Sequence, residues 1–86
     1  MSERKYTFIV EWFDPAASVV KQFYFTYFMP AKQIEMVVLS NIQYDIKNHK
    51  IFLKKIQYPE VKLDDLFIGN VIMCYNRQLK IVAFGD

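Results

Sequence analysis

The chain has 86 residues, of which 53% are hydrophobic and 17% aromatic, and a formal net charge of +2. This length predicts a single domain, residues 1–86. The apolar content predicts a packed core and excludes a disordered or collagen-like chain. The small charge excludes the strongly basic balance typical of nucleic-acid-binding domains, and a single cysteine excludes an internal disulfide.

Residues 6–12 alternate in character, and one face carries Tyr6, Phe8, Val10 and Trp12. A period of two predicts a strand. Asp14-Pro15 ends it, although the same pair is also typical of a helix start. The residues that follow are rich in β-branched and aromatic side chains, which favour strands. We therefore predict a turn over residues 16–18 and a long second strand over residues 19–29.

Residues 34–46 are ambiguous. By pattern they hold two strand segments, 34–39 and 42–46, around a reversal at 40–41. A family resemblance implies that residues 37–43 are an insertion. Seven extra residues cannot continue one strand without turning later side chains to the wrong face. This segment is therefore expected to bulge, loop out or form a short hairpin, and its apolar residues carry an association risk or a partner contact.

The last third of the chain predicts a strand at residues 51–53, a connection, and a turn or single helical turn at 63–67. Residues 71–75 and 79–84 then form a hairpin around a polar reversal at 76–78. The predicted fold is therefore mainly β, a small antiparallel barrel or sandwich of about six or seven strands.

Four blocks of residues carry a resemblance to a known domain. In chain order they are Glu11-Trp12-Phe13-Asp14-Pro15; Asp45-Ile46-Lys47-Asn48-His49 with Phe52-Leu53-Lys54-Lys55; Asp65-Leu66 with Ile68-Gly69-Asn70; and Arg77 and Leu79 with Phe84-Gly85-Asp86. On these blocks the whole chain resembles the DM-ten domain of axonemal proteins. It looks most like the version that precedes the kinase modules in a ciliary homologue of nucleoside diphosphate kinase. The residues expected to fix this domain's structure are Trp12, Asp14, Pro15, Asn48, Phe52, Asp65, Gly69, Asn70, Arg77 and Gly85.

The resemblance implies a fold similar to a pleckstrin-homology barrel, which a C-terminal helix closes. Here the chain stops where that helix would begin. We therefore expect an abbreviated form of a longer protein, with an open barrel end that favours self-association or a partner.

No constellation of residues predicts catalysis. His49 is followed by Lys50-Ile51, so the phosphate-accepting role of the kinase histidine does not transfer to it. One cysteine and one histidine do not make a zinc site, and two isolated glycines, Gly69 and Gly85, form no phosphate-binding loop. Both are expected at bends where a side chain would clash. Cys74 is expected to be buried, and Asp64-Asp65 to cap a turn or a helix start. We predict no catalytic residue, no cofactor and no metal.

A basic cluster is the candidate partner-binding site: Lys47, His49, Lys50, Lys54 and Lys55. Three interpretations stay open. The lysines protect a strand edge, they dock on an acidic protein surface such as tubulin, or they bind anionic lipid headgroups, which we rank last.

Exposed members of the aromatic set are a second candidate contact surface: Trp12, Phe13, Tyr24, Phe25, Tyr27 and Phe28, most of which should be core. The chain shows neither a signal peptide nor an apolar run of spanning length, which predicts a cytoplasmic protein. The leading hypothesis is a non-catalytic protein-interaction module that docks on axonemal doublet microtubules or their inner proteins. The alternative is a fragment of a nucleoside diphosphate kinase homologue whose catalytic domain is absent here.

Overall fold

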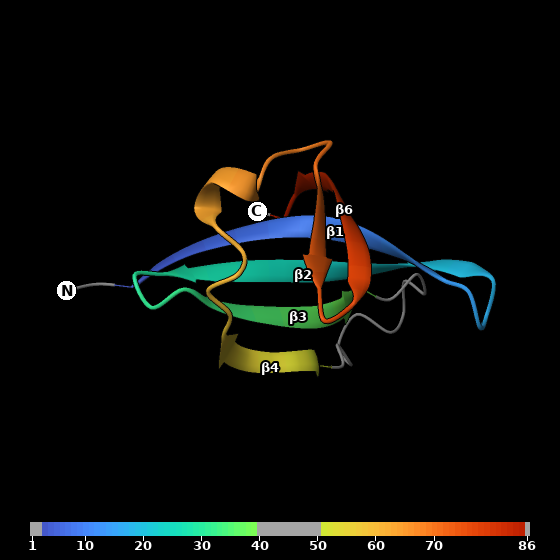
Figure 1. Ribbon diagram of the computed structural model, residues 1–86, viewed down its shortest axis with the longest axis horizontal. Coiled ribbons are helices and arrows are strands. Elements are labelled where there is room, and N and C mark those ends of the chain that lie inside the picture. Colours follow the sequence, from blue (N-terminus) through green and yellow to red (C-terminus); the bar gives the residue numbers. More distant parts are fainter. Residues whose placement is uncertain (1–2, 40–50, 86) are drawn as a thin grey trace.

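The computed structural model describes residues 3–39 and 51–85. In this part of the chain it contains six strands and one short 3-10 turn (Figure 1). They are β1 (Arg4–Asp14), β2 (Val19–Met29), β3 (Gln33–Leu39), β4 (Ile51–Gln57), the 3-10 turn η2 (Leu63–Asp65), β5 (Val71–Cys74) and β6 (Arg77–Phe84). The predicted mainly-β fold is confirmed.

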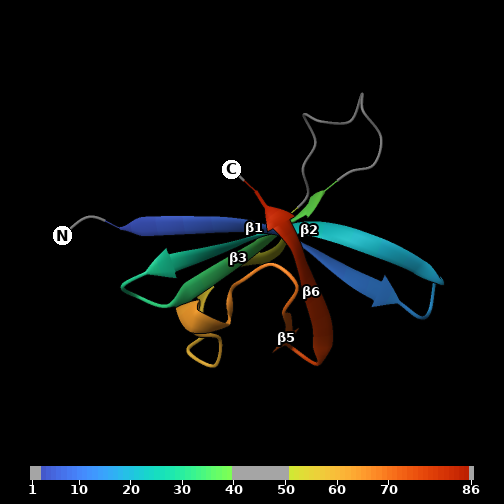
Figure 2. The same ribbon diagram turned by 90° about the horizontal axis from the view of Figure 1, so that it is seen from above.

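All six strands form one antiparallel sheet in the order β4-β3-β2-β1-β6-β5. The sheet curls into a half-barrel, in which β1 to β4 lie one beneath another and β6 runs at a steep angle across β1 (Figures 1 and 2). The pairing of β1 with β6 shifts register between Ile9 and Val10, and a bulge of this kind bends a sheet. The two end strands, β4 and β5, do not pair with each other.

The concave face of the half-barrel holds the core. Alternate residues of β1 and β2 point into it, as the period of two requires. Residues 58–70, which connect β4 to β5, cross this face, and Val61 and Leu66 are buried there. The core consists of Phe8, Val10, Phe23, Phe25, Tyr27, Ile34, Met36, Val61, Leu66, Ile72, Cys74, Leu79 and Ile81.

The turn between β1 and β2 settles the two interpretations of Asp14-Pro15. Residues 15–18 form a turn and β2 begins at Val19, so the helix start is wrong. The Asp14 carboxylate accepts a hydrogen bond from the Ala16 N–H at 3.0 Å, the local bond by which Asp favours turns. The predicted bounds of the second strand are confirmed.

The reversal between β5 and β6 lies at Tyr75-Asn76, not at residues 76–78. Both residues have positive φ, 50° and 65°, and Cys74 pairs directly with Arg77. Two consecutive positive φ angles define the two-residue turn whose twist matches a hairpin. Arg77 and Gln78 therefore belong to β6. Their polar character had suggested a longer reversal.

Residues 37–39 belong to a regular strand. β3 runs to Leu39, and Val37 and Val38 pair with Tyr24 and Phe23 of β2 without a break. The irregularity lies on the other side, where the pairing of β3 with β4 shifts register on both sides of Met36. Residues 40–43, the rest of the proposed insertion, and the predicted strand segment 42–46 fall outside the described residues.

Candidate interaction surface

The structure places two members of the predicted basic cluster, both on β4. Lys55 Nζ lies 2.8 Å from Glu3 Oε2 and 4.2 Å from the centroid of the Phe28 ring. The Lys55 ammonium group therefore interacts with other residues of this chain. Lys54 is exposed and has no ion pair with another described residue. The other three members, Lys47, His49 and Lys50, lie outside the described residues, as does Asn48, so the cluster stays a prediction.

Three of the motif residues, Trp12, Phe52 and Arg77, are far apart in the sequence but lie in contact. They meet at the mouth of the half-barrel, by which we mean its open side, where β4 faces the β5–β6 hairpin. The Arg77 guanidinium carbon Cζ lies 5.0 Å from the ring centroid of Trp12 on β1 and 5.0 Å from that of Phe52 on β4. Phe52 also packs on Phe23, with ring centroids 4.8 Å apart. Arg77 Nε is buried and has no hydrogen-bond partner among the described residues. Arg77 thus links three strands through ring faces.

A second contact across the mouth joins Tyr58 to Tyr75. Their ring centroids are 4.8 Å apart, and the Tyr75 N–H donates to Tyr58 Oη at 3.3 Å. A ring contact and one backbone-to-side-chain hydrogen bond therefore hold the residue that follows β4 near the β5–β6 hairpin. Beside them a cavity of about 370 Å³ is lined by Met36, Phe52, Leu53, Cys74, Tyr75 and Arg77.

Asp65 and Asn70 form a separate motif pair. Asn70 Nδ2 donates to the Asp65 carbonyl at 2.7 Å, and Asp65 Oδ2 accepts from the Lys62 N–H at 3.3 Å. The predicted capping role is confirmed for Asp65, whereas the Asp64 side chain is exposed. These bonds fix the turn that leads into β5.

The two glycines have different reasons to be glycine. A Cβ on Gly85 would lie 2.5 Å from Thr7 Cγ2, so the expected clash is confirmed there. Gly69 has φ +97° and open space around it. The clash predicted for Gly69 is wrong, because its backbone conformation is what disfavours a side chain.

Four apolar side chains form an exposed patch across the end of the β1–β2 hairpin and β5. We call this the apolar patch: Phe13, Val20, Val71 and Met73. Each is about half exposed, between 50% and 55%. Phe13 lines two adjoining hollows, one shared with Val20 and Val71 and the other with Met73. Grouped exposed apolar residues of this kind are typical of contact surfaces. Of the six predicted aromatic contacts, Phe13 alone is strongly exposed.

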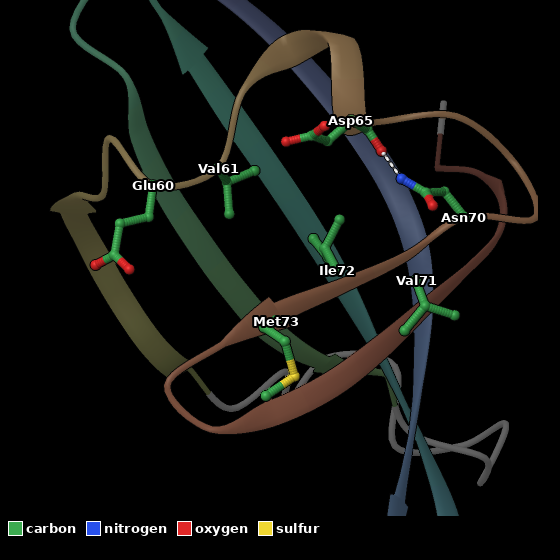
Figure 3. A pocket seen from close by; sticks show the side chains of 7 residues that line it. All are labelled: Glu60, Val61, Asp65, Asn70, Val71, Ile72 and Met73. Carbon is green, nitrogen blue, oxygen red and sulfur yellow. Dashed lines mark hydrogen bonds between the residues drawn. The ribbon is translucent and has the colours of Figure 1, made fainter.

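A more polar hollow of about 430 Å³ lies between β5 and the connection that precedes it (Figure 3). Glu60 and Val61 on the connection lie across from Ile72 and Met73 on β5. Its lining consists of Glu60, Val61, Asp65, Asn70, Val71, Ile72 and Met73. Among the described residues, its lining therefore contains two carboxylates and no cationic side chain.

Two buried groups near this hollow, Cys74 and Tyr27, have raised pKa values. Burial raises the pKa of Cys74 to about 11, with a smaller contribution from the charge of Glu60 and an opposing one from Arg77. Burial, and then the charge of Asp65, raise the pKa of Tyr27, whose hydroxyl donates to the Val61 carbonyl at 3.3 Å. Cys74 is 2% exposed, which confirms its burial. A neutral, buried thiol is a poor nucleophile.

Within residues 3–39 and 51–85, no group of three His, Cys, Asp or Glu side chains is placed to hold a metal ion. The same residues contain no helix with the length and apolar character needed to span a membrane.

Sequence reasoning missed Val20, Val71 and Met73. Both faces of β5 carry apolar residues, so alternation could not distinguish the buried Ile72 and Cys74 from their exposed neighbours. Glu60 was also missed, because only the packing of the connection against β5 gives it a role.

No family model matches the chain. The chain is 38% identical over 85 residues to the Rattus norvegicus protein "Nucleoside diphosphate kinase homolog 7" and equally identical to its Mus musculus counterpart. Each alignment covers 99% of this chain and 20% of the relative. The chain spans about a fifth of the length of these curated relatives, and it is similar to that part of them.

Proposed function

We propose that this chain is a DM-ten domain that serves as a non-catalytic docking module, and that the apolar patch is its contact surface. The patch is the observation that carries the proposal: four grouped side chains, each half exposed, on strands of the sheet. Exposure of such apolar side chains to water is unfavourable. A partner that covers them therefore gains binding free energy from their burial. The mechanism is passive, because a rigid sheet presents the patch to a neighbouring protein.

The resemblance to axonemal DM-ten domains supports a place on doublet microtubules or their inner proteins. In such a setting Lys54 would steer encounter with an acidic surface such as that of tubulin. The similarity to one fifth of nucleoside diphosphate kinase homolog 7 supports a second proposal. In that proposal the chain is one module of a longer kinase homologue and lacks the catalytic part.

Co-sedimentation of the purified chain with axonemal doublets at low salt tests docking. The wild-type chain should pellet with the doublets, and Phe13→Ser should not. Phe67→Ser is the matched control, because Phe67 is also 55% exposed but lies outside the patch. Docking on the doublet is rejected if the wild type stays in the supernatant, and the patch is rejected if the two variants behave alike.

The second proposal is tested on the transcript and on the purified chain. An open reading frame beyond Asp86 that encodes a kinase histidine motif would support it, and a stop codon there would contradict it. A phosphotransfer assay on the 86-residue chain should show no turnover. Turnover that disappears in His49→Ala would overturn the non-catalytic assignment.

A further inference from the structure

β5 has one free edge. In the part of the chain that the structure describes, it is the last strand of the sheet and pairs only with β6. The two-residue turn makes Cys74 and Arg77 a hydrogen-bonded pair, and the Ile81 N–H donates to the Asn70 carbonyl at 2.9 Å. Residues 70, 72 and 74 therefore direct their backbone groups toward β6. Val71 and Met73, which alternate with them, direct their N–H and C=O groups away from the sheet.

This free edge faces the hollow of Figure 3, which Val71 and Met73 help to line. At the end of the same edge, the Tyr75 N–H is satisfied by the Tyr58 hydroxyl. No described residue forms a backbone hydrogen bond with Val71 or Met73 across the hollow. A row of unpaired donors and acceptors is the template to which an extended peptide adds as a strand.

The charge of the hollow selects what kind of strand can enter. Glu60 lies near the start of the connection and Asp65 in its middle, at the end of η2, and no cationic side chain of the described residues lines the hollow with them. Only two residues of β5 offer backbone hydrogen bonds to an added strand, so these bonds alone give little affinity. Attraction between charged side chains must therefore contribute to binding. A segment that carries two or more lysines or arginines would complement both carboxylates.

A second copy of this chain fits the edge less well. β5 itself carries no basic residue, and pairing two β5 edges would bring the carboxylates of both copies together. Like charges placed in this way oppose association. The other end strand among the described residues is β4, which carries Lys54 and Lys55 and pairs irregularly with β3. These features discourage strand addition.

We infer that the free edge of β5 accepts an extended, basic segment of a partner protein as an added strand. The inference rests on the proposed docking function and specifies how part of the partner is held. The strand hydrogen-bonds to Val71 and Met73, its basic side chains reach Glu60 and Asp65, and its outer side chains adjoin the apolar patch.

The test uses the ¹⁵N-labelled 86-residue chain and the capped heptapeptide Thr-Lys-Val-Lys-Val-Lys-Thr. In the free chain the Val71 and Met73 amides should exchange with solvent quickly while those of Ile72 and Cys74 are protected. Addition of the peptide should shift the Val71 and Met73 resonances and slow their exchange. A peptide methylated on alternate backbone nitrogens keeps its charge but loses the strand donors, and should bind about tenfold more weakly.

A second set of variants tests whether the hollow prefers a basic peptide. Glu60→Gln combined with Asp65→Asn should weaken peptide binding several-fold at low salt and little at high salt. Asp64→Asn, which removes an acid outside the hollow, should not. The inference is overturned if the glutamate version of the peptide binds equally well, or if the shifts map elsewhere. A dimer that protects Val71 and Met73 in the absence of peptide would also overturn it.

The two proposals fail separately. If the wild type pellets with doublets and Phe13→Ser does not, but the peptide leaves β5 unchanged, the added strand is rejected and docking stands. If the peptide binds β5 and the chain does not pellet, the axonemal partner is rejected and the strand site stands.

Discussion

The guanidinium of Arg77 lies between the rings of Trp12 and Phe52, 5.0 Å from each ring centroid. Trp12 belongs to β1 and Phe52 to β4, at the far end of the sheet. A planar cation stacked on two aromatic faces is attracted by both. From its place at the start of β6, Arg77 therefore stabilises the curled form of the half-barrel.

Arg77→Met keeps the apolar stem and removes the charge. It should lower the free energy of unfolding by about 1–2 kcal/mol, because both ring contacts are lost. Urea denaturation followed by the fluorescence of the only tryptophan measures this change. Lys80→Met, on the same strand, should have little effect. Equal midpoints for wild type and Arg77→Met would show that the stacking contributes nothing.

Gly85→Ala should destabilise the chain by about 1–3 kcal/mol, because the new Cβ meets Thr7 Cγ2 and must displace β1 or β6. Thr7→Ser removes that methyl group and keeps the hydroxyl that lies 3.3 Å from Thr26 Oγ1. Gly85→Ala should therefore cost less in the Thr7→Ser background. Thermal unfolding of the wild type, the two single variants and the double variant gives the coupling, and simple additivity would exclude the clash.

Gly69→Ala is the contrasting case. It should cost about 1 kcal/mol through its positive φ, and Thr7→Ser should not reduce that cost. The same thermal measurement applies. A Gly69→Ala chain as stable as the wild type would mean that the turn before β5 adopts another conformation in solution.

Cys74 should make stability fall at alkaline pH. Its pKa is about 11 in the folded chain against an ordinary value of 9.0, so between these values the unfolded chain has lost the thiol proton and the folded chain retains it. The contribution of the Cys74 thiol to the free energy of unfolding is therefore fully present below pH 9 and is lost as the pH rises through 11. Urea midpoints between pH 8 and 11 should fall more steeply for the wild type than for Cys74→Ala. Parallel profiles would contradict the buried, neutral thiol.

Lys55 and Lys54 should differ although they are neighbours. Lys55→Ala loses the Glu3 ion pair and uncovers Phe28, so it should lower stability by up to about 1 kcal/mol. Lys54→Ala should stay within about 0.5 kcal/mol of the wild type. If docking depends on an acidic partner, doublet co-sedimentation should weaken in Lys54→Ala. Unchanged docking would favour the edge-protection interpretation of these lysines.

Local patterns were sufficient for the first two strands. Alternation over β1 and the density of aromatic and β-branched residues in β2 predicted both, and the bounds of β2 were predicted to the residue. The predicted 51–53 strand was too short. In β4 the lysines follow Leu53 and the pairing with β3 is irregular, so no simple alternation marks its end.

The candidate site could not be predicted in the same way, because it depends on how distant segments pack. Nothing in the order of residues shows that Phe13 adjoins Val71 and Met73. The same holds for Glu60, which faces β5 only because the connection folds back over the sheet. The resemblance placed Trp12, Phe52 and Arg77 in different blocks, and their contact emerges only when the sheet curls.

The Tyr58–Tyr75 stack has an evolutionary consequence. The β4 end of the sheet and the β5–β6 hairpin are held together by contacts of Tyr58 with Tyr75 and of Phe52 with Arg77, without a ladder of strand hydrogen bonds. Rotation of these few side chains can widen the mouth of the half-barrel while all strand pairings are kept. Relatives that carry smaller residues at these two positions should therefore have a broader mouth on an unchanged sheet, and lineages could acquire new occupants without inventing a new fold.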